Sequence, residues 1–446
     1  MTIHASGSGH GHRSPRVRVT TRGRSVEAVT LAGVVHDGGH LPGSPELRRV
    51  AVALFLAGVA TFASIWATQP LLPTLAADFG VTPAQAALSV SGPTLALGLG
   101  LLVAGPLSDV RGRTWLVHGS LLATGVVGLA CAFAWSWESL LVLRTVQGLV
   151  LAGLPAVATA YLREEVDRRA VTGVTGLYVG GTALGGMSGR LLAAPLAELG
   201  GWRTAVAGIA VLVLLCAALV RWSLPPSRRF RPVPARPRAL LSQTGRMLRD
   251  PVLVGLFAVG GLLMGAFVAV FNGLGFRLES AEFGLSTGVA GLVFTTYALG
   301  SVSSTLAGRL SARPAGPRPV VPVGIAVAVA GVLITLSPRL PLVVAGVAVM
   351  VVGFFAAHGT TSGWVAARAS YGSGGAGQAA SLYLLAYYTG ASVAGTAAGW
   401  AWSSGGWARV VELAGALMAA ALLVSLALIR TRRLAPPPEG PGVEPG

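Results

Sequence analysis

The chain has 446 residues, of which 53% are hydrophobic and only 11% are charged. This composition excludes a single soluble domain and favours a polytopic membrane protein. All 33 basic residues are arginine and the formal net charge is +17, so the placement of arginine decides between a nucleic-acid-binding protein and a membrane protein.

Residues 1–47 are rich in glycine, serine, histidine and arginine, a composition typical of disordered segments. Their short apolar stretch, 26–35, lies too far from the first residue for a cleaved signal peptide. His4, His10 and His12 have no second ligand cluster near them in the sequence, so we expect neither a metal site nor a cofactor. We interpret this segment as a disordered cytoplasmic tail.

Twelve apolar runs follow, each bounded by arginine, glycine or proline and each long enough for a helix to cross a bilayer. They are residues 50–72, 85–107, 115–134, 139–162, 171–194, 202–221, 251–276, 287–310, 320–336, 340–367, 376–402 and 410–429. This pattern predicts an all-α polytopic membrane protein with twelve transmembrane helices in two six-helix bundles. We place the bundles at 48–222 and 251–430, followed by a second tail at 431–446.

The arginines are unevenly distributed between the two predicted sides of the membrane. Seventeen lie in loops or span ends on one side, four on the other, ten before the first span or after the last one, and two well inside the spans. An excess of positive charge marks cytoplasmic loops, and an even number of spans puts both termini on that side. We therefore expect a multi-pass inner (plasma) membrane protein with both termini in the cytoplasm and with no nucleic-acid partner.

A charged segment separates the two predicted bundles. Residues 223–250 contain five prolines and an arginine cluster, which makes the segment too polar and too broken to cross a membrane. We predict a cytoplasmic linker there. Its arginine cluster fits two interpretations, a solvated charge run or a contact with anionic headgroups of membrane lipids.

The two halves resemble internal repeats at a constant offset of 205 residues. Three pairs of sequence markers share this offset: Gly176-Leu-Tyr178 with Ser381-Leu-Tyr383, Gly185 with Gly390, and Gly200-Gly-Trp202 with Gly405-Gly-Trp407. Duplicated bundles around a central path are the arrangement that transporters use for alternating access. This repeat favours transport over a purely structural membrane role.

Residues 105–113 form a short polar reversal between the second and third spans and read Gly-Pro-Leu-Ser-Asp-Val-Arg-Gly-Arg. The pattern alone predicts a membrane hairpin. With Gly105, Leu107, Asp109, Gly112 and Arg113 it resembles the signature loop between helices 2 and 3 of the major facilitator superfamily. The resemblance implies a cytoplasmic gate, in which Asp109 bonds to a helix N-terminus or to an arginine of the adjoining loops.

Two further arginines lie at membrane depth, where an ionisable side chain is costly and indicates function. Arg144, with Gln147 one turn away, resembles the helix 4 motif of the superfamily, in which the arginine is associated with proton coupling. An arginine that extends to the outer surface would fit the same position. Arg190 likewise fits either a substrate-binding residue or one that reaches the outer surface.

Glycines recur every fourth residue in the fifth span, at Gly181, Gly185 and Gly189. Such spacing predicts close packing against another helix. Arg190 follows Gly189 and is rotated by about 100° around the helix, so we expect its side chain to point into a cavity while the glycines pack. The antiporter motif of the superfamily often has a Gly-Pro pair here, whereas this chain has Gly181-Thr182, and the resemblance to antiporters is partial.

The tenth and eleventh spans supply the remaining candidates for substrate binding or proton coupling. His358 lies on a helix face with aromatic and hydroxyl side chains, where it either titrates near neutral pH or bonds structurally to a neighbouring helix. Tyr383 and Tyr387 share a face, a pattern that suits a planar ligand as well as ordinary packing. No aspartate or glutamate lies well inside a span.

The segments 185–190, 358–364 and 381–388 resemble bacterial inner-membrane transporters of the acriflavine-sensitivity group. This resemblance implies proton-coupled efflux of small organic compounds by a monomer, with protons and the solute as its partners. The two arginines, without an embedded acid, suit an anionic or neutral solute and leave open an uptake permease for such a metabolite. The sequence shows no nucleophile–base pair, metal-ligand spacing or phosphate loop, so we do not expect an enzyme.

Overall fold

The computed structural model describes residues 18–21, 24–27, 39–232, 237–314, 316–372 and 375–431. Most of both predicted tails lies outside these residues. Within the first tail, where the sequence predicted disorder, β1 (Arg18–Thr21) pairs with β2 (Arg24–Glu27) in an antiparallel hairpin. The rest of the described chain is helical.

The first half of the chain contains α1 (Pro45–Trp66), η2 (Gln69–Leu71), α2 (Leu72–Phe79), α3 (Pro83–Arg111), α4 (Arg113–Ala132), α5 (Trp137–Leu151), α6 (Gly153–Glu165) and α7 (Arg168–Ser223). The second half contains α9 (Pro251–Glu279), α10 (Thr287–Gly291), η3 (Leu292–Thr296), α11 (Tyr297–Ser311), α12 (Val320–Ile334), α13 (Leu340–Gly372) and α14 (Ala376–Ile429). The predicted linker carries one further helix, α8 (Pro237–Leu248), which is too short to cross a bilayer.

Polar cap residues set the starts of the long apolar helices. The Thr82 hydroxyl accepts a hydrogen bond from the backbone N–H of Gln85, whose side chain binds the Thr82 backbone in return. Asp250 caps α9 by accepting from the backbone N–H of Val252. Because the first backbone N–H groups of a helix have no partner inside it, these caps fix where each span begins.

Nine helical segments of the described chain are long and apolar enough to cross a membrane, and α12 is a shorter apolar helix. Two of the nine, α7 and α14, each contain two spans, because non-helical residues interrupt them at Gly200–Gly201 and Gly405–Gly406. The helix count is therefore consistent with the twelve predicted spans. The all-α polytopic fold is confirmed.

The two interruptions have nearly the same backbone geometry. Gly201 has φ 76° and ψ −179°, and Gly406 has φ 62° and ψ −150°. Side chains other than hydrogen are strongly disfavoured in this region. The paired glycines therefore allow the chain to reverse between two spans without a loop.

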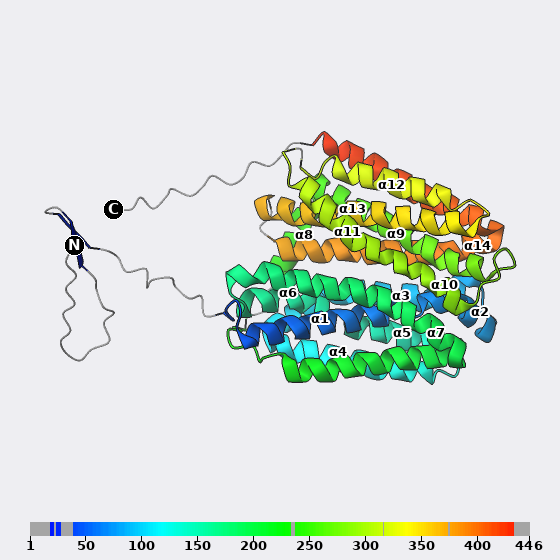
Figure 1. Ribbon diagram of the computed structural model, residues 1–446, viewed down its shortest axis with the longest axis horizontal. Helices are drawn as coiled ribbons and strands as arrows, with labels where there is room; N and C mark the ends of the chain where they lie inside the picture. The colour runs from blue at the N-terminus through cyan, green and yellow to red at the C-terminus, as the bar shows by residue number, and fades with distance from the viewer. Residues whose placement is uncertain are drawn as a thin grey trace.

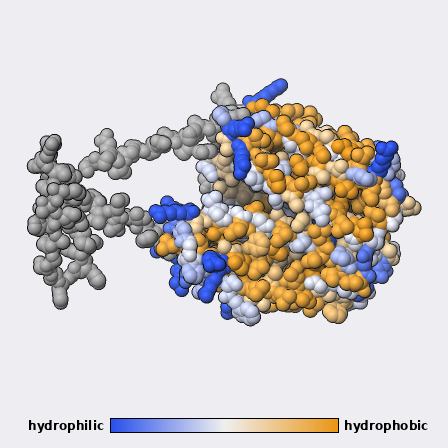
Figure 2. All heavy atoms as spheres, viewed as in Figure 1, coloured by the Kyte–Doolittle hydropathy of each residue, from blue (hydrophilic) through white to orange (hydrophobic). Residues whose placement is uncertain are grey.

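The two halves lie side by side along the length of the molecule (Figure 1). We call residues 105–113 the hinge, and the end of the molecule where they lie, with α8 and the start of α1, the hinge end (Figure 1). We call the opposite end, with α2, the turn end. Apolar side chains cover the middle of the visible surface, while hydrophilic ones gather at the two ends (Figure 2), as expected for a protein with its long axis across a bilayer.

Contacts between the halves are found from the middle of the molecule to the turn end. The hydroxyls of Thr94 on α3 and Ser392 on α14 are 2.8 Å apart, and the Gly288 backbone N–H donates to Glu198 at 2.8 Å. Toward the hinge end the surface is hollowed between the halves (Figure 2). The described structure is thus closed at the turn end and hollow toward the hinge end.

Candidate functional site

The glycine stripe of α7 is covered by α1. A Cβ atom added at Gly181, Gly185 or Gly189 would lie 2.4 Å from a backbone oxygen of α1, belonging to Phe55, Val59 and Ala63 respectively. Any larger residue would push the helices apart. This close contact places the end of α1, and η2 after it, next to the part of α7 that carries Arg190.

Arg190 is buried between the halves, with 2% of its surface exposed. Its Nε donates to the Gln69 side-chain oxygen at 2.6 Å, and Nη1 donates to the Gly186 carbonyl at 2.5 Å. The guanidinium carbon lies 4.5 Å from the ring centre of Trp66 and 4.6 Å from that of Tyr297, within the range of cation–π attraction. These contacts exclude the interpretation in which Arg190 extends to the outer surface.

A chain of amide hydrogen bonds continues from Arg190 into the second half. The Gln69 amide nitrogen donates to the Asn272 side-chain oxygen at 2.8 Å, and the Asn272 amide nitrogen donates to the Gly395 carbonyl at 3.1 Å. Gly395 is the repeat counterpart of Arg190 at the 205-residue offset. Within the first half Gln69 thus contacts Arg190, and within the second half Asn272 contacts Gly395, which is the repeat counterpart of Arg190. The hydrogen bond between Gln69 and Asn272 joins the two halves.

Next to Arg190 lies a group of rings that we call the aromatic cluster, consisting of Phe267, Tyr297, Phe354, Phe355, His358, Tyr383 and Tyr387. Phe267 and Phe354 stack with ring centres 3.9 Å apart, and Tyr387 lies 4.8 Å from His358. His358 Nδ1 and the Tyr383 hydroxyl are 2.8 Å apart. The structure therefore brings His358 of α13 together with Tyr383 and Tyr387 of α14, a contact between helices that the pattern within each span did not predict.

Four members of the aromatic cluster keep partial exposure, namely Tyr297, Phe355, His358 and Tyr387. Tyr297 begins α11 directly after the 3-10 helix η3, so the eighth span is irregular beside Arg190. Breaks of this kind at membrane depth are typical of substrate sites in transporters. Residues of both halves, Arg190 on one side and the cluster on the other, form the candidate site.

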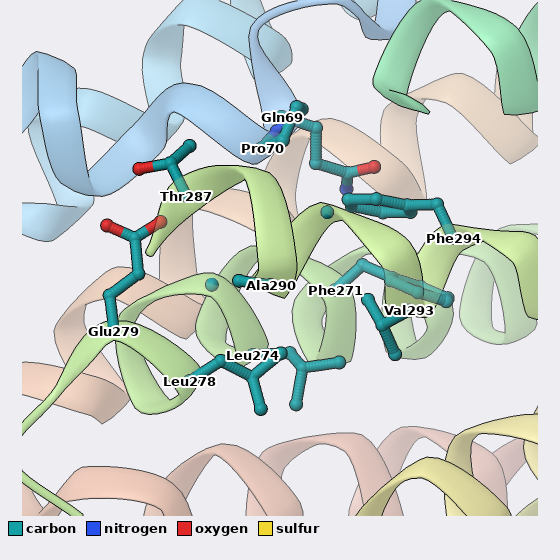
Figure 3. A pocket seen from close by; sticks show the side chains of 12 residues that line it. Gln69, Pro70, Phe271, Leu274, Leu278, Glu279, Thr287, Ala290, Val293 and Phe294 are labelled. Carbon is teal, nitrogen blue, oxygen red and sulfur yellow. The ribbon is translucent and has the colours of Figure 1, made fainter. Parts of the chain in front are cut away.

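A small pocket lies on the turn-end side of this site. It is framed by Gln69 and Phe294 near one end and by Glu279 and Thr287 at the other (Figure 3). It leaves about 10 Å³ for the centre of a water molecule, which is room for about one water. The pocket cannot hold an organic solute in this state, in agreement with closure at the turn end.

Arg144 is also buried, with 2% of its surface exposed, and it does not reach the outer surface. Its three nitrogens donate to five acceptors: the carbonyls of Ser64, Ile65 and Ser89 and the side chains of Thr68 and Gln147. An arginine has five N–H groups, so none is left for a ligand. Two of the acceptors are carbonyls of the last turn of α1, and Arg144 therefore caps that helix where the first span breaks.

The Gln147 amide nitrogen donates to the Ser64 hydroxyl and to the Thr124 carbonyl. It therefore completes the set of contacts that Arg144 makes among α1, α3 and α4. The structure does not bring Arg144 or Gln147 into the aromatic cluster. Their predicted part in substrate binding or proton coupling stays a prediction, which the direct contacts of this state do not support.

The hinge residues form a network inside the first half. Arg113, 7% exposed, donates from Nη1 to Asp109 at 2.5 Å and from Nη2 to Glu164 at 2.6 Å. Gly112 makes the reversal with φ 107°, and the Gly105 carbonyl accepts from the Ser108 hydroxyl. Asp109 thus binds an arginine of its own hinge, and its carboxylate remains 43% exposed.

Sequence reasoning missed Trp66, Gln69, Phe267, Asn272 and Tyr297 as parts of the site. Asn272 could have been found, because it is an amide within the strongly apolar run 251–276, where an unpaired polar group is costly. The aromatic residues gave no comparable signal, since aromatic side chains are common in spans and interfaces.

The family model described as Major Facilitator Superfamily matches residues 54–281, which is half of the chain. The chain belongs to this superfamily. Its relatives include the inner membrane transport protein YnfM of Escherichia coli, 41% identical over 87% of this chain and 92% of YnfM. The MFS-type transporter YybF of Bacillus subtilis is 38% identical over 88% of this chain and 96% of YybF. Membership in the superfamily makes the protein a multi-pass inner-membrane transporter and not an enzyme.

Solved structures share the superfamily fold. A bacterial homologue of the human lysosomal transporter Spinster, inward-facing and unoccupied, gives a TM-score of 0.67 at 17% identity and covers 86% of this chain and 96% of its own. The peptide transporter POT gives 0.69 at 14% identity and covers 88% and 95%. At these identities the likeness concerns the fold alone.

Proposed function

We propose that this member of the superfamily exports a small organic solute across the inner membrane by alternating access, in exchange for protons. The proposal rests chiefly on one observation: the candidate site lies between two repeated halves that touch at the turn end and leave a hollow toward the hinge end. In this proposal the hinge end faces the cytoplasm, and the solute enters the aromatic cluster from there. The resemblance to the acriflavine-sensitivity group supports export.

His358 is the proposed proton carrier. Among the described residues of the cluster it is the one side chain whose ordinary pKa is close to neutral, and no carboxylate belongs to the cluster or bonds to Arg190. Its Nδ1 is engaged with the Tyr383 hydroxyl and the residue is only partly buried, so in this proposal Nε2 is the nitrogen that exchanges a proton.

Export and its coupling are tested separately. In a strain that lacks its own exporters, expression should lower the cellular accumulation of the transported compounds in a substrate screen, and collapse of the proton gradient should abolish the effect. Increased accumulation would instead establish the alternative, an uptake permease for an anionic or neutral metabolite.

The coupling role of His358 needs a variant that keeps the hydrogen bond to Tyr383. His358→Asn places an amide close to the position of Nδ1 and retains a donor and an acceptor, but it cannot take up a proton near neutral pH. In proteoliposomes it should still exchange solute across the membrane at a measurable rate, while an imposed pH gradient should no longer drive accumulation. Normal gradient-driven accumulation by the variant contradicts the assignment.

A further inference from the structure

Arg190 carries a positive charge that no carboxylate neutralises in the described part of the chain. Its partners are the Gln69 amide, the Gly186 carbonyl and the faces of aromatic rings. Of the other buried or half-buried arginines, Arg113, Arg277 and Arg368 each pair with an acid at 2.5–2.8 Å. Arg144 has no acid either, but five neutral acceptors occupy all of its N–H groups. Because an uncompensated buried charge is expensive, the environment of Arg190 favours the arrival of an anion.

Two hydrogen-bond donors at this place also lack an acceptor. The Tyr297 hydroxyl is buried and has no hydrogen-bond partner among the described residues, although buried hydroxyls normally find one. The Nη2 atom of Arg190 likewise makes no hydrogen bond to any described residue, since the guanidinium uses Nε and Nη1. The Tyr297 ring centre is 4.6 Å from the guanidinium carbon, so both donors belong to the same part of the site.

The remainder of the site consists of packed aromatic rings, of which Phe355, His358 and Tyr387 keep partial exposure. Phe354 stacks on Phe267 and on His358, and Phe355 lies edge-on to Phe354 and Tyr297. Planar π-systems bind between such faces and edges. The acceptor group is thus expected at one end of a ligand whose other end is planar.

We propose that the solute is an organic anion with a planar aromatic body. Its anionic group accepts hydrogen bonds from Arg190 Nη2 and the Tyr297 hydroxyl, while its rings lie against the partly exposed rings of Phe355 and Tyr387. This inference rests on the proposed transport function, since it names the solute class of that same site. A cationic solute is disfavoured, because it would meet the Arg190 charge at close range.

Equilibrium binding tests the charge without requiring transport. Three compounds that share one ring system, 2-naphthoate, 2-naphthylmethanol and 2-naphthylmethylamine, are titrated into the purified full-length protein in lipid nanodiscs by calorimetry. We expect the acid to bind roughly tenfold or more tightly than the alcohol, because charge-assisted bonds are the stronger ones, and the amine to bind most weakly. Equal or tighter binding of the alcohol or the amine would overturn the proposal.

Substitutions test whether the preference for the acid depends on Arg190 and Tyr297. Arg190→Gln should weaken acid binding roughly ten- to hundredfold and Tyr297→Phe roughly three- to tenfold, with little change for the alcohol. Arg409→Gln is the matched control, because Arg409 is 61% exposed and should leave all three affinities unchanged. If Arg190→Gln does not fold, Tyr297→Phe and the wild-type ranking still decide. Acid affinity that is unchanged in Tyr297→Phe, or in a folded Arg190→Gln, refutes the assignment.

A flux assay in proteoliposomes distinguishes failure of this inference from failure of the proposed function. Transport of the alcohol or the amine but not of the acid overturns the anion class and leaves the transport function standing. Preferential acid binding without flux of any solute tested supports the site and overturns the export proposal.

Discussion

The hydrogen bond between the side-chain amides of Gln69 and Asn272 joins the two halves toward the turn end. The substitution Asn272→Leu removes this hydrogen bond while keeping a side chain of similar size. Gln69 would retain its bond from Arg190, because that bond lies within the first half. In the closed state the Gln69 amide nitrogen would be buried without its acceptor. In a state that is open at the turn end, water would satisfy the same group, so the variant should favour opening.

The expected magnitude follows from the group that is left unpaired. Leaving one buried neutral polar group without a partner costs about 1–3 kcal/mol, which corresponds to a shift of roughly 5–150-fold in a two-state equilibrium. The Asn272–Gly395 bond is also lost, but it lies within the second half and contributes similarly to both states. The shift should therefore fall in this range.

Spin labels can report the distance at the turn end. Leu199 on α7 and Val289 on α10 are 82% and 51% exposed, and cysteines placed there accept nitroxides after the buried Cys131 and Cys216 are replaced by alanine. Pulsed dipolar spectroscopy on Asn272→Leu should show a larger population at long distance than the parent protein.

The matched control for this measurement is Thr396→Val. It removes a different bond between the halves, the one that Thr396 donates to Ser91 at 3.0 Å, and that bond is outside the amide chain and only partly buried. If Asn272→Leu shifts the population no more than Thr396→Val, the amide chain does not hold the turn end closed.

Three further predictions concern topology, the hinge and the second half. A reporter that is active only outside the inner membrane should give no signal when fused after Gly446, and a strong signal would contradict a cytoplasmic C-terminus. Asp109→Asn keeps the side-chain shape but removes the charge, so we expect normal expression with transport reduced several-fold; an unchanged rate would rule out gating. Burial raises the pKa of Asp250, but the hydrogen bonds and charge of Arg368 outweigh it and hold that pKa below its ordinary value. The pair therefore stabilises the protein above the unfolded pKa of about 3.9, and this contribution is lost as the pH falls through the lower folded pKa. Asp250→Asn should lower the unfolding free energy by about 1–2 kcal/mol at neutral pH, measured by denaturation, and a loss that persists in full below both pKa values would contradict this.

The sequence predicted the spans well because a helix in a bilayer needs a long apolar run, and such runs are local. The same holds for the stripe at Gly181, Gly185 and Gly189, where the spacing alone indicated close packing and the structure places α1 on that face. The breaks inside spans were not predicted, since η3 lies within a continuously apolar segment. The spacing of apolar residues does not reveal where the hydrogen bonding of a helix changes from the α to the 3-10 pattern.

The partners of the buried arginines were beyond prediction for a different reason. Gln69 is 121 residues from Arg190, and Asn272 is 203 residues from Gln69, so these contacts depend on how the halves meet. The choice between a surface-reaching and a ligand-binding Arg190 rested on depth in the membrane alone. The burial of Arg190, which argues against the surface-reaching alternative, becomes visible only once the fold is known.

The Gly200–Gly201 and Gly405–Gly406 turns bear on how the protein enters the membrane. No loop lies between the two spans that each turn joins, so no folded extramembrane segment separates them. We expect the two spans of each pair to enter the bilayer together as one helical hairpin, because both helices are apolar and satisfy their own backbone hydrogen bonds. Insertion of a polar spacer at either turn would therefore alter the order of membrane integration while leaving the mature helices unchanged in sequence.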